Sequence, residues 1–159
     1  MSRKALLQRL GGLKRWINFW PPFLGAGIRV VHISSDLKAI DVEMPLRFYN
    51  ANYVGTHFGG SLFAMTDAFY MLMLMEQLGP DYIVWDKAAT IRYKTPGRGT
   101  VRVEFRLTDQ QVADIRAAAD SAHKHEPTLL VEVKDANGSV VAEIEKLLYV
   151  RKKRAEERQ

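Results

Sequence analysis

The chain has 159 residues, of which 47% are hydrophobic, and a formal net charge of +5. This length allows one domain with a sizeable core and leaves little room for a second. The chain contains no cysteine, which excludes disulfides, thiolate metal sites and cysteine nucleophiles and suits a reducing cytoplasm, where we expect the protein. A basic chain suits an anionic partner, yet most of the excess charge lies at the two ends.

The first 27 residues predict an amphipathic helix followed by a proline loop. Its apolar residues recur at helical spacing, opposite basic ones: Leu6, Leu10, Leu13, Ile17 and Trp20. Lys14 and Arg15 interrupt the apolar stretch, so we expect neither a signal peptide nor a membrane span. We expect the helix to pack on its own domain, with binding to a membrane surface as the alternative.

The hydrophobic period then changes to two at 30–34 and 38–44, which predicts a pair of strands. From 61 to 78 the composition is helical and almost wholly apolar, and a Gly-Pro pair ends the segment. A helix this apolar must be buried on several sides.

Strict alternation returns after that helix. We expect strands at 89–95 and 101–107 joined by a PGRG turn, a short helix from 109 to about 122, and a closing hairpin of 128–135 with 140–152. An apolar helix bracketed by antiparallel strands implies an α+β fold in which the sheet wraps around the helix.

We divide the chain into an N-terminal segment (1–27), a main domain (28–150) and a charged tail (151–159). The tail has no aromatic residues among its basic ones, so we expect a solvated end and no nucleic-acid partner. Two histidines and a glutamate at 123–126 lack further close ligands, so we expect no metal there. The glycine patterns of nucleotide-binding loops are absent from the sequence, and we expect no cofactor.

One acid stands inside the apolar helix. Between 61 and 75 the only ionisable side chains are Asp67 and Tyr70, and a carboxylate in such surroundings loses hydration unless it is paired or faces a cavity. Asp67 is therefore either a structural aspartate bonded to a nearby backbone or basic group, or a functional acid. We favour the functional acid, because isolated buried acids are rare.

A glycine pair, Gly59 and Gly60, stands just before the helix. Glycines there let a ligand approach the backbone and leave the first amides unpaired, which favours an anion such as a tetrahedral oxyanion. Gly59 and Asp67 are eight residues apart, or about 12 Å along one helix, too far to act on one carbon. Two chains with antiparallel helices could join the glycine end of one to the acid of the other, so catalysis would require a dimer.

The stretches NYVGTHFGGSLFAMTD and DKAATIRYKTPGRGTVRVEFRL resemble the hotdog-fold acyl-CoA thioesterases, both the phenylacetate-pathway type and the tetrameric acyl-CoA thioesterase-like branch. The resemblance covers roughly residues 38–150. It implies a hotdog fold, an antiparallel sheet around a long central helix, here with an extra N-terminal helix. It also implies hydrolysis of acyl-CoA to free acid and CoA, within lipid metabolism, at a site shared by two subunits of a homodimer or homotetramer.

The resemblance also implies roles for individual residues. Asn52 falls on the family's asparagine, Gly59 on its oxyanion-hole donor, and Asp67 on the acid that acts as nucleophile or general base. The family has histidine directly before the glycines, whereas here Phe58 stands there and His57 lies one residue earlier. The role of a histidine is therefore left open.

A second departure is Asp86, which falls where the phenylacetate-type enzymes have serine or threonine. A second carboxylate near Asp67 could make one of the two acids harder to ionise, or could pair with Lys87 or Arg92. Both alternatives stay open.

We expect hydrolysis in which Asp67 activates water or attacks directly, and Asn52 holds the water or the thioester in line. The expected catalytic residues are Asp67, Asn52, Gly59 and Gly60. The expected substrate-binding residues are His57, Phe58, Phe63, Met71, Asp86, Lys94 and Arg98. The acyl chain would enter a tunnel beside Phe63, Met71 and Leu74, while Lys94 and Arg98 would meet the CoA phosphates or remain solvated turn residues.

Three alternatives remain: a noncatalytic acyl-CoA or fatty-acyl binding protein, a hotdog hydratase or dehydratase, and a purely structural oligomer. The type of acyl group and the choice between CoA and carrier-protein thioesters stay open.

Overall fold

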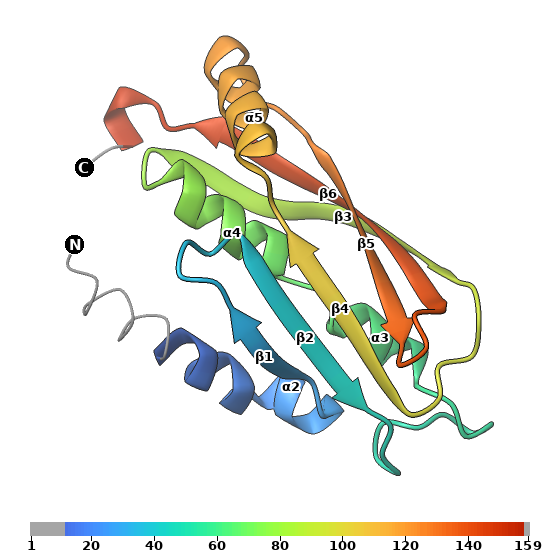
Figure 1. The fold of residues 1–159 in the computed structure, drawn as a ribbon. Helices are drawn as coiled ribbons and strands as arrows, with labels where there is room; N and C mark the ends of the chain where they lie inside the picture. Colours follow the sequence, from blue (N-terminus) through green and yellow to red (C-terminus); the bar gives the residue numbers. More distant parts are fainter. Residues whose placement is uncertain (1–11, 158–159) are drawn as a thin grey trace.

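The computed structural model describes residues 12–157. Its body is a six-stranded antiparallel sheet in the order β1-β2-β4-β5-β6-β3 (Figure 1). The strands are β1 (Arg29–Ile33), β2 (Ala39–Pro45), β3 (Tyr82–Tyr93), β4 (Thr100–Arg106), β5 (Thr128–Asp135) and β6 (Val140–Lys152). The helices are α2 (Pro21–Ala26), α3 (Gly59–Ala64), α4 (Phe69–Leu78) and α5 (Asp109–Ser121), with a short 3-10 helix η1 (Ala155–Glu157).

The core lies between α4 and the inner face of the sheet. Alternate residues of β4 are fully buried, and the arginines and glutamate between them are exposed, as the strict alternation predicts. Phe69 and Met73 of α4 are buried, and the ring of Phe69 lies 4.9 Å from that of Phe105 on β4. The α+β class and the sheet that wraps around an apolar helix are confirmed.

The strand β3 is longer than the alternation predicts. It begins at Tyr82, whereas the expected strand starts at 89. A register shift between Asp86 and Ala88 interrupts the alternation, so the first half of β3 does not continue the pattern of the second half. At the other end of the chain, β6 continues through Lys152, so the first residues of the expected tail belong to the sheet.

The single helix expected over 61–78 consists of two helices, α3 and α4. The hydroxyl of Thr66 donates to the carbonyl of Phe63 at 2.8 Å at the end of α3. Ala68 then adopts a left-handed conformation with φ of 67°, which interrupts the helix before α4 begins. Because the apolar composition is continuous across the break, its periodicity does not reveal it. Asp67 consequently lies in the break rather than on a helix.

The N-terminal segment is helical over residues 12–19 and packs on the domain. The loop expected at the prolines is wrong: Pro21 and Pro22 begin the helix α2, because the fixed φ of proline suits the first turn of a helix. Ile17 is buried, and the side chain of Asn18 exchanges hydrogen bonds with the backbone of Val30 on β1 at 3.1 and 2.7 Å. The predicted helix positions Leu6 and Leu10 lie outside the described residues. Within the part of the chain that the structure describes, no helix is both long and apolar enough to span a membrane.

Candidate functional site

Asp67 lies beside a buried lysine. Its Oδ1 accepts a hydrogen bond from Nζ of Lys146 at 2.8 Å, and Oδ1 of Asp86 lies 3.2 Å from the same nitrogen. The lysine side chain is only 3% exposed, whereas that of Asp67 is 50% exposed. A buried ammonium group therefore lies between two carboxylates, and we call Asp67, Asp86 and Lys146 the acid cluster.

The strands explain how these side chains meet. Lys146 stands in the inward row of β6 between Ile144 and Leu148, and all three are fully buried. Asp86 is the partner of Leu148 in the antiparallel register, so it faces the same side, and the register shift at Ala88 follows directly. Lys146 was not among the predicted site residues, although strict alternation in β6 places this lysine on the apolar face.

The partners proposed for Asp86 were wrong. Nζ of Lys87 lies 2.7 Å from Glu126, and Arg92 pairs with Glu145. Among the described residues, neither cation forms an ion pair with Asp86. The buried lysine of the acid cluster provides the positive charge instead.

A hollow of about 520 Å³ opens at the start of α3, and we call it the glycine hollow. The helix has no side-chain N-cap, and no hydrogen bond among the described residues is donated by the amides of Gly59 or Gly60. A Cβ on Gly59 would lie 2.7 Å from Oη of Tyr93, so the backbone comes close to a neighbouring side chain here. These two amides can donate to an anion, as the glycine pair predicts.

Asn52 lines the glycine hollow but uses its side chain within its own loop. Its Oδ1 accepts from the amides of Val54 and Thr56 at 3.1 and 3.0 Å. Its Nδ2 donates to Oγ1 of Thr56 at 2.8 Å and to the carbonyl of His57 at 3.3 Å. Both amide protons are thus used, which does not fit the expected contact with water or thioester. We assign Asn52 to shaping the loop that carries the glycines.

His57 is buried in the wall of the glycine hollow. Its Nε2 lies 2.9 Å from the carbonyl of Gly99, and its Nδ1 is buried without a hydrogen-bond partner among the described residues. Burial lowers the pKa of His57, and the bond to Gly99 opposes this only in part. The neutral ring donates from Nε2 to the loop between β3 and β4. Phe58, which stands where the resembled family has histidine, is exposed.

The basic residues expected at the CoA phosphates differ in position. Lys94 lines the glycine hollow, and its Nζ lies 2.9 Å from Glu143. Arg98 is exposed in the turn after β3 and does not line the hollow. Of the two, only Lys94 is in place to meet a ligand bound at the glycines.

The residues expected along an acyl tunnel do not line one cavity. The ring of Phe63 lies 6.0 Å from Nζ of Lys146, beside the acid cluster. Met71 is partly buried against the core, and Leu74 is fully buried within it. Leu74 therefore cannot contact a substrate in the described chain.

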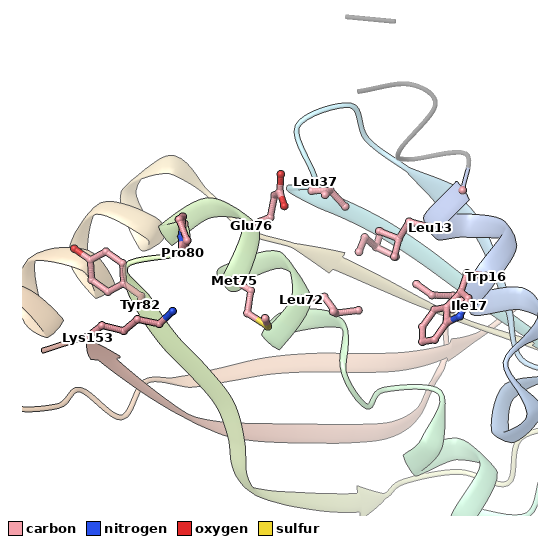
Figure 2. Close-up of a pocket in the computed structure, with 13 residues that line it drawn as sticks. Leu13, Trp16, Ile17, Leu37, Leu72, Met75, Glu76, Pro80, Tyr82 and Lys153 are labelled. Carbon is pink, nitrogen blue, oxygen red and sulfur yellow. The ribbon is translucent and has the colours of Figure 1, made fainter. Parts of the chain in front are cut away.

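An apolar groove of about 740 Å³ lies instead between the N-terminal helix and α4. Figure 2 shows Leu13 and Trp16 of the helix over residues 12–19 on one side, and Leu72 and Met75 of α4 on the other. The sequence pattern predicts no binding site here, because the N-terminal helix is an ordinary amphipathic helix and the apolar residues of α4 fit a buried helix.

One chain does not bring the two candidate halves of the site together. The acid cluster gathers around the break between α3 and α4, and none of its three residues lines the glycine hollow. Asp67 and Gly59 stand at opposite ends of α3. The two halves of the candidate site are therefore separate within one chain.

The sheet order and the buried helix define a hotdog fold, which solved structures share. A Pseudomonas aeruginosa protein of unknown function, described as a probable thioesterase, matches with a TM-score of 0.77 at 21% identity, over 96% of this chain and 97% of its own. A candidate thioesterase from Shewanella oneidensis matches with a TM-score of 0.66 at 22% identity, over 93% and 99% of the two chains. A Haemophilus influenzae thioesterase has a TM-score of 0.63 at 13% identity, over 90% of each chain.

These similarities show the fold, which is that of thioesterase-like hotdog proteins. The model of the domain of unknown function DUF4442 matches residues 13–150, so the chain belongs to the DUF4442 family. A comparison with curated proteins finds no match.

Proposed function

We propose that the protein hydrolyses an acyl thioester, such as an acyl-CoA, at a site completed by two copies of the chain. The observation that carries this proposal is the setting of Asp67. A buried lysine holds its Oδ1, while its Oδ2 has no hydrogen bond among the described residues and half of the side chain is exposed. Structural neighbours described as thioesterases support the same chemistry.

In the proposed reaction, the thioester carbonyl oxygen accepts hydrogen bonds from the amides of Gly59 and Gly60. Oδ2 of Asp67, from the second copy, takes a proton from water as the water oxygen attacks the carbonyl carbon. The carbon–sulfur bond then breaks, the oxyanion becomes the carbonyl of the free acid, and the thiolate leaves. Asp67 returns its proton to the thiolate or to solvent. A thiolate leaves readily, so the scheme needs no separate acid such as His57.

The edge of the sheet supports the proposed dimer. β3 pairs with β6 on one side, and no strand of the described chain covers its other side. Several side chains along it are exposed, including Trp85 and Tyr93. A long bare edge strand tends to pair with another chain unless it is protected. Pairing of two β3 strands across a twofold axis would bring the glycine hollow of one copy toward the acid cluster of the other.

The first test is release of free thiol from a panel of acyl-CoAs with short, long and aromatic acyl groups. Because the chain has no cysteine, a thiol reagent reports only the CoA that is released. We expect wild-type turnover and a loss of about 10²-fold or more in Asp67→Asn. Asp114→Asn, a change of the same kind on α5, is the matched control and should keep the wild-type rate. Tight acyl-CoA binding without turnover would instead indicate a binding protein, and no binding would refute both.

The second test asks whether one site uses two chains. Asp67→Asn and Gly59→Ala proteins are each expected to be inactive, and are then mixed under conditions that exchange subunits. Half of the dimers would be mixed and would carry one intact site out of two, so activity should recover to about a quarter of wild type. If each site belonged to one chain, mixing would restore nothing.

A labelling experiment separates the two roles open to Asp67. A single turnover in ¹⁸O water would put the label into Asp67 if Oδ2 attacks the thioester directly and water then attacks the Asp67 carbonyl carbon of the anhydride, which releases the acid with an oxygen from Asp67. If Asp67 acts as a general base, water attacks the thioester carbon and the label appears only in the released acid.

A further inference from the structure

We propose that Lys146 is a positioning residue of the site: it fixes Asp67 by one oxygen and lets Asp67 and Asp86 remain ionised side by side. The inference rests on the proposed function for its effect on catalysis. The effect of Lys146 on the ionisation of Asp67, however, can be tested without any substrate.

Two carboxylates and an aromatic ring lie around the ammonium group of Lys146. Nζ of Lys146 has Asp67 at 2.8 Å, Asp86 at 3.2 Å and the ring of Phe63 at 6.0 Å. An ammonium group that is buried without partners is strongly unfavourable, and two carboxylates offset that cost. Lys146 is therefore charged and held from two sides.

Asp86 is the second carboxylate beside Lys146. Its Oδ1 is buried and makes no hydrogen bond of normal geometry with any described residue. The nearby ammonium group of Lys146 is thus the positive charge that balances this carboxylate. Without the lysine, two acids would stand next to each other with no cation between them.

Asp86 also lines a hollow with Lys87, Lys124 and Glu126, in which both lysines pair with Glu126. Along the inward row of β6, the neighbours of Lys146 are Ile144 and Leu148, and α3 presents Phe63. Glu145 points to the other side of the strand and pairs with Arg92. With every member ionised, the cluster holds two negative charges and one positive charge.

The balance of charges in the acid cluster determines whether Asp67 can act as a base. Two carboxylates that share a site without a cation tend to hold one proton between them. An Asp67 that is protonated cannot accept a proton from water. Lys146 would thus keep the acid usable at lower pH, and it would leave Oδ2 free by binding only Oδ1. A purely structural lysine would tie β6 to the helix break without affecting how Asp67 titrates.

The test follows the ¹³C resonance of the Asp67 carboxyl carbon as pH is changed, with Asp67→Asn used for assignment. Lys146→Met keeps the length of the side chain and removes the charge. We expect the titration of Asp67 to move to higher pH by about one pH unit or more. Adding Asp86→Asn to this variant should reverse at least half of that shift. Lys134→Met, on β5 and paired with Glu132, is the control and should leave the titration unchanged.

The acid limb of the pH–rate profile should follow the same order in the same proteins. An unshifted Asp67 titration in folded Lys146→Met would overturn the positioning role, even with wild-type turnover present. The expected shift without any wild-type turnover would instead sustain the electrostatics and refute the thioesterase proposal. If Lys146→Met does not fold, the Asp86→Asn variant alone tests the inference. It should move the titration of Asp67 to lower pH, and a shift to higher pH or no shift would refute the inference.

Discussion

The hydroxyl of Tyr93 lies so close to Gly59 that a methyl group on the glycine would be 2.7 Å from Oη. Gly59→Ala should therefore push the end of the tyrosine side chain aside, because a flexible ring yields more easily than the backbone. We expect a folded protein whose displaced ring narrows the approach to the amides. Thioester hydrolysis should fall by about 10²-fold, measured as kcat/KM for the best acyl-CoA of the panel.

Two further variants make this result interpretable. Gly25→Ala on α2 has no atom within 4 Å of the new methyl group, so it should keep the wild-type rate. Combining Gly59→Ala with Tyr93→Ala removes the clash and should recover part of the lost activity. Full activity in Gly59→Ala alone would show that the tyrosine contact does not control access to the hollow.

Ala68 holds the break between α3 and α4 in a left-handed conformation that costs an L residue about 1 kcal/mol. Ala68→Gly should relieve this strain and raise the free energy of unfolding by up to about 1 kcal/mol. Ala113→Gly, in the interior of α5, is the matched change with the opposite sign. It should lower the free energy of unfolding by about 1 kcal/mol, because glycine is a poor helix former. Urea unfolding measures both, and equal losses in the two variants would refute strain at Ala68.

The sequence predicts most of the sheet, because its strands alternate strictly. The pattern places 101–107 and 128–135 almost at the observed bounds of β4 and β5. Thr108 and Gln111 form a capping box at the start of α5, so the shorter helix was also predictable. The break at Ala68 was not, because composition fixes the burial of a segment but not a single backbone angle.

Some residues of the candidate site could likewise be predicted from the sequence, and others could not. Asp67 and the glycines stand out, because an acid inside an apolar run and a glycine pair before a helix are visible locally. Lys146 becomes visible only when β6 is aligned against the helix break, since its contact with Asp67 spans 79 residues of chain. The use of Asn52 within its own loop likewise depends on backbone geometry that no spacing rule specifies.

On the outer face of the sheet, Asp41 is held by two arginines. Its side chain is 8% exposed, with Arg106 Nη1 at 2.6 Å and Arg102 Nη2 at 2.8 Å. Burial alone would raise the pKa of Asp41, but the hydrogen bonds from Arg106 and Arg102 outweigh it and the pKa is lowered. Asp41→Asn should reduce the free energy of unfolding by about 2 kcal/mol. The loss stays below that of a fully buried pair, because both arginines are half-exposed and regain water.

The pH dependence provides the check on Asp41. Because the folded pKa lies below the ordinary value of 3.8, the stabilisation is complete above that value and is lost as pH falls through the folded pKa. The difference between wild type and Asp41→Asn in urea unfolding should therefore shrink in strong acid. Glu104→Gln alters an exposed acid beside the same arginines and should change stability by less than about 0.5 kcal/mol. A constant difference at every pH would contradict the assignment.

His57 should make the fold sensitive to mild acid. Burial lowers the pKa of His57 below its ordinary value of 6.5, so the folded state favours the neutral ring. The stabilisation that comes from the neutral ring of His57 is fully present above pH 6.5. It is lost as the pH drops from there toward the folded pKa, because the unfolded chain takes up the proton first. His57→Gln can still donate to the carbonyl of Gly99 but cannot be protonated. Urea unfolding at about pH 7.5 and about pH 5.5 should show a smaller loss in this variant than in wild type.

The control for His57 is His123→Gln, which changes an exposed histidine after α5 and should retain the full acid response of wild type. The buried Nδ1 of His57 explains the difference, because a proton placed there would find no acceptor among the described residues. Equal acid responses in His57→Gln and wild type would mean that another group titrates in this range. The loop between β3 and β4 that accepts the hydrogen bond of His57 also lines the glycine hollow. Thioester hydrolysis should therefore decline only when the pH falls below the lowered folded pKa of His57 and the ring of the folded protein takes up a proton.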